Sequence, residues 1–145
     1  MNVISNIIDE LVKNIKKDDA FSDICFVKGF SVTENPDPFS SYMIAVSTLD
    51  SHMKSEFLGD IVGENLTGNM LELTVKFRIY APKNDGGDGL VDMSNRMCES
   101  IRKHDVHSVC KDISVSSIAF DEGAMTVYRD VVALMSFCVF EEVGG

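Results

Sequence analysis

One segment with alternating apolar and polar residues constrains the fold of this chain more than any other feature. From Leu71 to Tyr80 the apolar residues Leu71, Leu73, Val75, Phe77 and Ile79 alternate with Glu72, Thr74, Lys76, Arg78 and Tyr80. Successive side chains of a β-strand point to opposite faces, so this period of two indicates a strand with one face on the core. The chain is therefore predicted to contain a sheet that is covered on one face.

Two segments with helical periodicity can supply that cover. Val3 to Ile15 places its apolar residues three and four positions apart, which is the spacing of an amphipathic helix. A second segment has the stripe Leu90, Met93, Met97 and Ile101, and we predict that Asp88 caps its N-terminus. Both helices would bury one apolar face against the sheet.

Further strands are predicted from runs of β-branched and aromatic residues between turn signals. Segment 56–68 holds three glycines and predicts two short strand pieces or a loose hairpin arm. The other predicted strands are Asp23–Val32, Tyr42–Leu49, Ile113–Phe120 and Thr126–Phe140. The fold class that follows is α+β: a mixed, mainly antiparallel β-sheet with an N-terminal helix and a second helix packed on one face. The length of 145 residues predicts a single domain, 1–145.

Composition excludes several functional classes. The longest apolar run, Val131–Phe140, is shorter than the twenty or so residues of a bilayer-spanning helix, so no membrane association is predicted. The N-terminus carries its charge after its apolar positions, unlike a secretory signal peptide, which predicts a cytoplasmic protein. The four cysteines form no CxxC pair, and a formal net charge of −10 disfavours free binding to nucleic acid.

Two segments resemble ligand sites in part. The loop Asn84–Gly89, NDGGDG, precedes a predicted helix as a phosphate loop does, but it lacks the lysine of GxxxxGK[ST] and places Asp85 and Asp88 where phosphate oxygens would lie. His104, His107 and Cys110 are spaced three apart and could hold a metal if the helix continues through them. We interpret the first as a structural turn and the second as a helix end, and predict no catalytic, metal or cofactor site.

The order of elements, the length and the segment IYAPKNDGG resemble the tail terminator (tail completion) proteins of long-tailed bacteriophages and of phage-tail-like bacteriocins. The resemblance extends over the whole chain, through VTENPDPF, the arm FLGDIVGENLTGN, the strand LELTVKFRIYAP and the closing β pair. It implies a non-enzymatic virion protein that forms a ring, usually a hexamer, caps the tail tube and stops its polymerisation. The ring would then join the neck or head, or form the collar of a headless particle.

The resemblance also implies the partners: further copies of the chain, the tail tube protein, sheath and neck or head-completion proteins, and DNA only by passage through the lumen. Assembly would take place in the bacterial cytoplasm. The interface with a neighbouring subunit or the tube is predicted on two arms and the glycine loop, at Asn35, Pro36, Pro38, Phe39, Leu58, Val62, Leu66, Asn84, Asp85, Gly86, Gly87 and Asp88.

Two alternatives remain open from the sequence. A neck or tail tube subunit of the same particle would share the sheet, the helices and the ring symmetry. A small metal-dependent cytoplasmic enzyme would use His104, His107 and Cys110. For the glycine loop, our hypothesis is a turn that reaches a neighbouring subunit, so that its glycines are required for backbone conformation.

Overall fold

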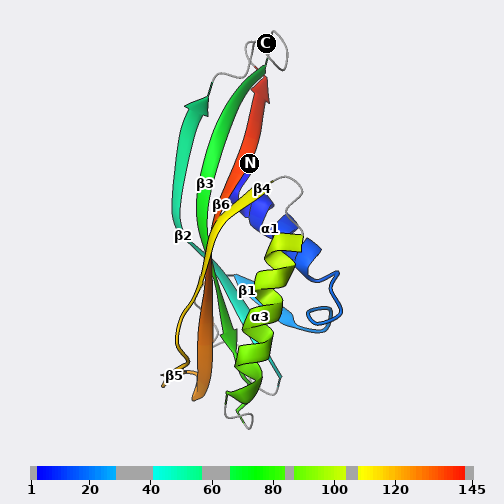
Figure 1. Ribbon diagram of the computed structural model, residues 1–145, viewed down its shortest axis with the longest axis vertical. Coiled ribbons are helices and arrows are strands. Elements are labelled where there is room, and N and C mark those ends of the chain that lie inside the picture. The colour runs from blue at the N-terminus through cyan, green and yellow to red at the C-terminus, as the bar shows by residue number, and fades with distance from the viewer. Residues whose placement is uncertain (1–2, 29–40, 57–65, 84–86, 104–107, 143–145) are drawn as a thin grey trace.

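The computed structural model describes residues 3–28, 41–56, 66–83, 87–103 and 108–142 of the chain. In that part the protein is α+β, with two helices and a six-stranded mixed sheet (Figure 1). The elements in chain order are α1 (Val3–Ile15), β1 (Cys25–Lys28), β2 (Met43–Glu56), β3 (Leu66–Tyr80), α3 (Asp88–Lys103), β4 (Ser108–Val115), β5 (Ala119–Asp121) and β6 (Thr126–Glu142).

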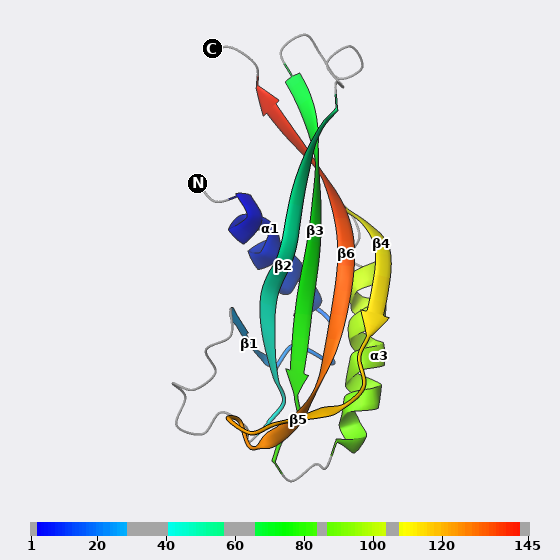
Figure 2. The ribbon, with the colours of Figure 1, turned by 90° about the vertical axis from the view of Figure 1, so that its left-hand side faces the viewer.

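The sheet has the order β1-β2-β3-β6-β4, and β5 pairs with the beginning of β6. The short strand β1 runs parallel to β2, whereas β2, β3, β6 and β4 alternate in direction. Both described helices lie on the same face of this sheet (Figures 1 and 2). The predicted fold class, including the helix at the N-terminus, is therefore confirmed.

The core lies between the sheet and the two helices. The alternating residues of β3 face it: Leu73, Val75, Phe77 and Ile79 are fully buried, together with Val131, Ala133 and Met135 of the neighbouring strand β6. The predicted stripe of α3, Leu90, Met93, Met97 and Ile101, is buried against them. Because each such side chain contributes roughly 1.5–3 kcal/mol when it leaves water, this apolar layer holds the helices to the sheet.

Helix α1 joins the same core and is also tied to α3 by polar contacts. Its buried residues Ile8, Leu11 and Ile15 recur at the predicted helical spacing. After the helix ends, the hydroxyl of Ser100 in α3 donates to the carboxylate of Asp18, and Lys103 Nζ lies 3.2 Å from the same carboxylate. The turn that follows α1 is thus fixed to the C-terminal half of α3.

Strands β2 and β3 are longer than predicted and form one extended hairpin. The predicted strand Tyr42–Leu49 continues to Glu56, which pairs with Gly68, so the ends of the predicted arm belong to the ladder. A register shift between Thr48 and Asp50 makes Leu49 a bulge. The residues beyond Leu49 are mostly polar and alternate only weakly, so no strand was predicted there. Pairing with β3 nevertheless holds them in a strand.

The predicted strand Ile113–Phe120 is divided in two by the structure. The first part belongs to β4, which begins at Ser108, and the second to β5. Between them, the amide of Ser116 donates to the carbonyl of Asp130, and Ser116 Oγ accepts from the amide of Asp130. The serine hydroxyl thereby replaces a ladder bond and lets the chain leave the sheet edge.

Two predicted element ends differ from the structure. Strand β1 covers Cys25–Lys28 of the predicted Asp23–Val32, and the remainder beyond Lys28 lies outside the described residues. Helix α3 begins at Asp88, and the carbonyl of Gly87 accepts from the amide of Leu90. The predicted cap at Asp88 is therefore wrong by one residue: Asp88 is the first residue of the helix, where its charge suits the helix dipole, and Gly87 occupies the position before it. In the described ranges no helix is long and apolar enough to cross a membrane.

Candidate interaction surface

Most residues of the predicted interface cannot be placed. Leu66 is the first residue of β3 and pairs with Glu142, and Asp88 is exposed at the start of α3. The rest of that prediction, apart from Gly87, lies outside the described residues: Asn35, Pro36, Pro38, Phe39, Leu58, Val62, Asn84, Asp85 and Gly86.

Gly87 shows the conformational requirement that was predicted for the glycine loop. Its φ is +95°, a value that residues with a Cβ rarely adopt, and it is buried. A Cβ built at this position would lie 3.3 Å from Cγ2 of Val127 and 3.7 Å from Cγ2 of Ile118. The contacts at Gly87 are therefore with its own subunit.

The predicted histidine and cysteine cluster does not share a helix. Helix α3 ends at Lys103, and Cys110 belongs to strand β4. His104 and His107 lie outside the described residues. The metal hypothesis required the helix to continue to Cys110, which instead belongs to strand β4. Among the described residues no group of three or more possible metal ligands occurs.

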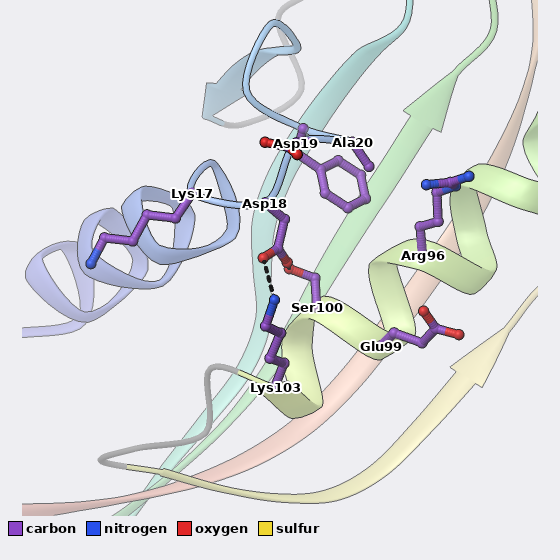
Figure 3. A pocket seen from close by; sticks show the side chains of 9 residues that line it. Lys17, Asp18, Asp19, Ala20, Arg96, Glu99, Ser100 and Lys103 are labelled. Atoms are coloured by element: carbon purple, nitrogen blue, oxygen red, sulfur yellow. Dashed lines mark hydrogen bonds and ion pairs between the residues drawn. The ribbon is translucent and has the colours of Figure 1, made fainter.

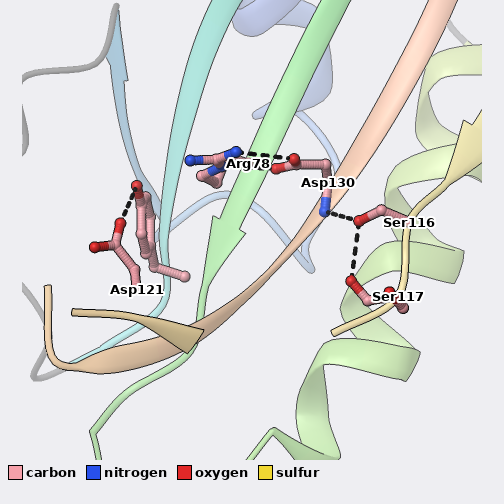
Figure 4. Close-up of polar contacts among 6 residues, drawn as sticks. Arg78, Ser116, Ser117, Asp121 and Asp130 are labelled. Carbon is pink, nitrogen blue, oxygen red and sulfur yellow. Dashed lines mark hydrogen bonds and ion pairs between the residues drawn. The ribbon is translucent and has the colours of Figure 1, made fainter. Parts of the chain in front are cut away.

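The face of the sheet opposite the helices carries a polar network. Arg78 of β3 makes two hydrogen bonds to Asp130 of β6, with Nε–Oδ1 at 2.8 Å and Nη2–Oδ2 at 3.0 Å (Figure 4). The guanidinium also lies 4.1 Å from the centre of the Tyr128 ring. The hydrogen bond to Asp130 raises the pKa of Arg78 above its ordinary value, so this pair remains charged.

The same network reaches the hairpin between β5 and β6. The hydroxyl of Tyr80 donates to Asp121 Oδ2 at 3.3 Å, and the rings of Tyr80 and Tyr128 are 5.9 Å apart. Burial raises the pKa of the Tyr80 hydroxyl, which keeps it protonated and able to donate. The carboxylates of Asp130 and Asp121 are both engaged in contacts within the subunit, which indicates a structural role for them.

Several large apolar side chains outside the core are exposed. Val115 ends β4, Ile118 follows it, Phe120 belongs to β5, and Met125 lies in the next turn. Phe120 is 56% exposed and Met125 62%, and Val91 in the first part of α3 is also exposed. We name Val115, Ile118 and Phe120, which follow one another from the end of β4 to β5, the apolar edge. Exposed apolar residues along a sheet edge are typical of a surface that binds another macromolecule.

The apolar edge is held in a fixed position by Arg129. Its Nε donates to the carbonyl of Ser116 at 2.7 Å, and its Nη1 donates to the hydroxyl of Ser94 in α3 at 3.0 Å. The Ser94 hydroxyl in turn donates to the carbonyl of Val91. One side chain thus connects β6, the segment between β4 and β5, and the start of α3, so the apolar edge is preformed.

A hollow of about 330 Å³ lies between the turn after α1 and helix α3 (Figure 3). Lys17, Asp18 and Ala20 line it from the turn, and Arg96, Glu99 and Lys103 line it from the helix. Asp18 is engaged by Ser100 and Lys103, and Arg96 pairs with Asp92 at 2.8 Å. Three acidic and three basic side chains line the hollow, so its lining is balanced in charge.

Sequence reasoning missed the apolar edge. A strand was predicted across Ile118 and Phe120, so these residues were assigned to a paired ladder. The available signal was the serine pair Ser116-Ser117, which favours a break in a strand. The positive φ of Met125 could not be predicted from the sequence, because it depends on the turn that surrounds this residue.

Comparison of the sequence with protein-family models and with curated proteins finds no match.

Proposed function

We propose that this protein is a structural subunit that forms a ring, usually a hexamer in the family it resembles, at the end of a phage tail or tail-like tube. The ring stops polymerisation of the tube and joins it to a neck or head, or forms the collar of a headless particle. Its partners are other copies of the chain and the tail tube protein, with sheath and neck proteins beside them. DNA passes through the lumen where a head is present, and assembly takes place in the bacterial cytoplasm.

The observation that supports this proposal best is the apolar edge. Phe120 and Ile118 are exposed on a preformed edge of the sheet, next to strand β4 at the end of the strand order. A ring requires a heterologous contact, in which one surface of a subunit meets a different surface of the next. Edge strands with exposed apolar side chains are poorly suited to remain free in solution.

The strand directions are also compatible with ring closure. Strands β2, β3, β6 and β4 alternate in direction, so the two outer strands of this set run oppositely. When copies are arranged side by side by rotation, β4 of one copy would meet β2 of the next in antiparallel orientation. Strand β1 pairs with β2 as far as Val46, which lies opposite Lys28. The rest of β2 extends past β1 and offers a second edge for such contacts.

The proposal is tested with the double variant Ile118→Ser, Phe120→Ser. Both side chains are exposed, so the fold should persist, whereas the mass under native conditions should fall from that of a ring to that of one subunit. Val91→Ser is the matched control, because Val91 is similarly exposed but belongs to helix α3 and to neither of the two sheet edges. Circular dichroism spectra of all three proteins verify that the fold is retained.

A functional measurement accompanies the mass. Wild-type protein added to assembling tail tube protein should shorten the tubes seen by electron microscopy, and the double variant should lose this effect. Open-ended tubes formed by this chain alone would identify it as a tube subunit. A lone subunit at all concentrations, with no effect on tube length, would refute the proposal.

A further inference from the structure

The free part of strand β2 matches strand β4 in length. On its outer side β2 pairs with β1 only at Met43–Val46. From the bulge at Leu49 to its end at Glu56, β3 is the one described strand that lies beside it. Strand β4, Ser108–Val115, has eight residues and lies at the other end of the strand order. Leu49–Glu56 has the same number, so β4 of a second copy can cover the whole of this free edge.

The ends of the two strands select one alignment. In an antiparallel pair with Val115 opposite Leu49, the first residue of β4 lies opposite the last residue of β2. The chain leaves the sheet edge at Ser116, directly after β4. It therefore leaves before it would reach Val46 of the second copy, where β1 already occupies the edge.

This alignment keeps each side chain on its own face of the sheet. Asp50 and His52 lie on the face opposite the helices, because their partners in β3 alternate with the buried residues of that strand. Ser114 and Asp112 lie on the same face by the same argument, through their partners in β6. The alignment places Asp50 opposite Ser114 and His52 opposite Asp112. Copies joined in this way form one continuous sheet with the described helices on one side.

The side chains that meet are complementary. Leu49 is 50% exposed and Val115 36%, so each is an apolar side chain that gains cover from the other. His52 and Asp112 are exposed, and neither forms an ion pair in the part of the chain that the structure describes. His52 lies beside Glu72 in its own sheet and would gain Asp112 on its other side. An imidazole between two carboxylates donates a hydrogen bond to one of them when neutral and to both when protonated.

The alignment also sets a stagger between neighbouring copies. Across β6, strand β4 is level with Leu71–Phe77 of β3, whereas Leu49–Glu56 is level with Gly68–Thr74. The second copy is therefore displaced along the strands by the step from Leu71 to Gly68, roughly 10 Å at a rise of about 3.3 Å per residue. Closed sheets have such a stagger because their strands tilt relative to the axis, so the displacement is compatible with a ring.

We propose that Ser108–Val115 of one copy pairs in antiparallel orientation with Leu49–Glu56 of the next copy, with Val115 opposite Leu49 and Asp112 opposite His52. The proposal rests on the proposed ring and names the two backbone edges that meet in it and their register. The two edges are different surfaces of the subunit, so the contact is heterologous, and each copy uses both of them once the ring closes.

The first experiment is cysteine cross-linking with the double variant Asp50→Cys, Ser114→Cys. Within one subunit β3 and β6 separate these positions by roughly 14 Å, which is too far for a disulfide. Between copies the two positions lie directly opposite, where Cβ atoms are about 5 Å apart. Mild oxidation of the assembled protein should give a ladder of covalent oligomers that ends at the ring number. Mass analysis of peptides should identify the link between positions 50 and 114.

Three controls define the register and the contact type. The pair His52→Cys, Ser114→Cys lies on the same face but is displaced along the strand, where diagonal neighbours are about 7–8 Å apart, so it should link far less. Each single variant reveals bonds to the native cysteines. An equimolar mixture of Asp50→Cys and Ser114→Cys proteins should give linked dimers and nothing larger through positions 50 and 114, because each copy carries one of the two partners.

The second experiment uses Leu49→Lys, read as the assembly constant from native mass measurements at several protein concentrations. A lysine at this edge cannot be covered by Val115, so assembly should weaken by about tenfold. Val91→Lys is the matched control, because Val91 is 49% exposed on α3 and should leave assembly unchanged. Circular dichroism spectra verify that both variants keep the fold.

The outcomes separate this inference from the proposed function. Rings in which positions 50 and 114 do not link, or link no better than the displaced pair, would overturn the edge contact and leave the ring itself in place. Rings that form normally with Leu49→Lys would overturn it as well. If wild-type protein never assembles and never affects tube length, the ring proposal fails and the edge contact fails with it.

Discussion

At the scale of single residues, the buried polar side chains differ in whether they have a hydrogen-bond partner. Arg129 and Ser94 join three elements by hydrogen bonds, and Arg78 and Asp130 pair with each other on the face of the sheet opposite α1 and α3. Ser136 of β6 is the contrast: it is 4% exposed, and its hydroxyl has no hydrogen-bond partner among the described residues. A buried hydroxyl without a partner loses its bonds to water and gains none in return.

This contrast gives a prediction for two serines of similar burial. Ser136→Ala should raise the free energy of unfolding by up to about 1 kcal/mol, because it removes an unsatisfied hydroxyl. Ser94→Ala should lower it by about 1–2 kcal/mol, because Arg129 then loses an acceptor. Urea unfolding of both variants measures the difference, and a destabilised Ser136→Ala protein would show that the hydroxyl has a partner.

At the scale of elements, the connection from β3 to α3 is the most constrained turn in the described chain. The positive φ of Gly87 and its closeness to Val127 join the helix start to β6. Thr126 Oγ1 donates to the carbonyl of Ala81 at 2.8 Å, which secures the end of β3 to the same strand. The helix therefore begins at a fixed point relative to the sheet.

A glycine pair tests this constraint. Gly87→Ala should cost about 1–3 kcal/mol of folding free energy, since it adds backbone strain and a contact with Val127. Gly123→Ala should change stability by less than about 0.5 kcal/mol, because its new Cβ would meet Asp121 Oδ1 at an ordinary 3.4 Å. Thermal unfolding of the two variants provides the comparison, and equal stabilities would contradict the role assigned to Gly87.

At the scale of the whole molecule, the described residues form a sheet with two helices packed on one face. Strands β3 and β6 have a strand on each side, while β4 and β5 lie at an edge. Stability should follow this order, because an edge strand opens without breaking two ladders. The free edge is also where the proposed function requires contact between copies.

Hydrogen exchange can test this order. In dilute protein, amides near Val75 and Ala133 should exchange slowest, and those of β4 and β5 should exchange much faster. At concentrations that favour rings, protection should rise at β4 and β5, with little change in β3. If the edge and central strands were equally protected from exchange in dilute protein, the predicted order of strand stability would be wrong.

The sequence alone determined the layers of this protein. Period-two alternation in Leu71–Tyr80 and helical spacing in Val3–Ile15 and Leu90–Ile101 are local patterns, and each records which face an element buries. The class and the cover of one face followed directly. The predicted interface stays a prediction, because most of its residues lie outside the described residues and no local pattern identifies the surface that they would contact.

The tertiary structure determined the strand ends and the exposed side chains, which no local sequence pattern contains. Pairing with β3 extended β2 to Glu56, and Ser116 ended β4 because Asp130 lay opposite it. The exposure of Phe120 and Met125 arose from that break and from a turn fixed by Asp121 and Tyr80, which are 41 residues apart. Burial patterns are properties of single elements, whereas a surface is made where elements meet, so the apolar edge could be found only in the folded chain.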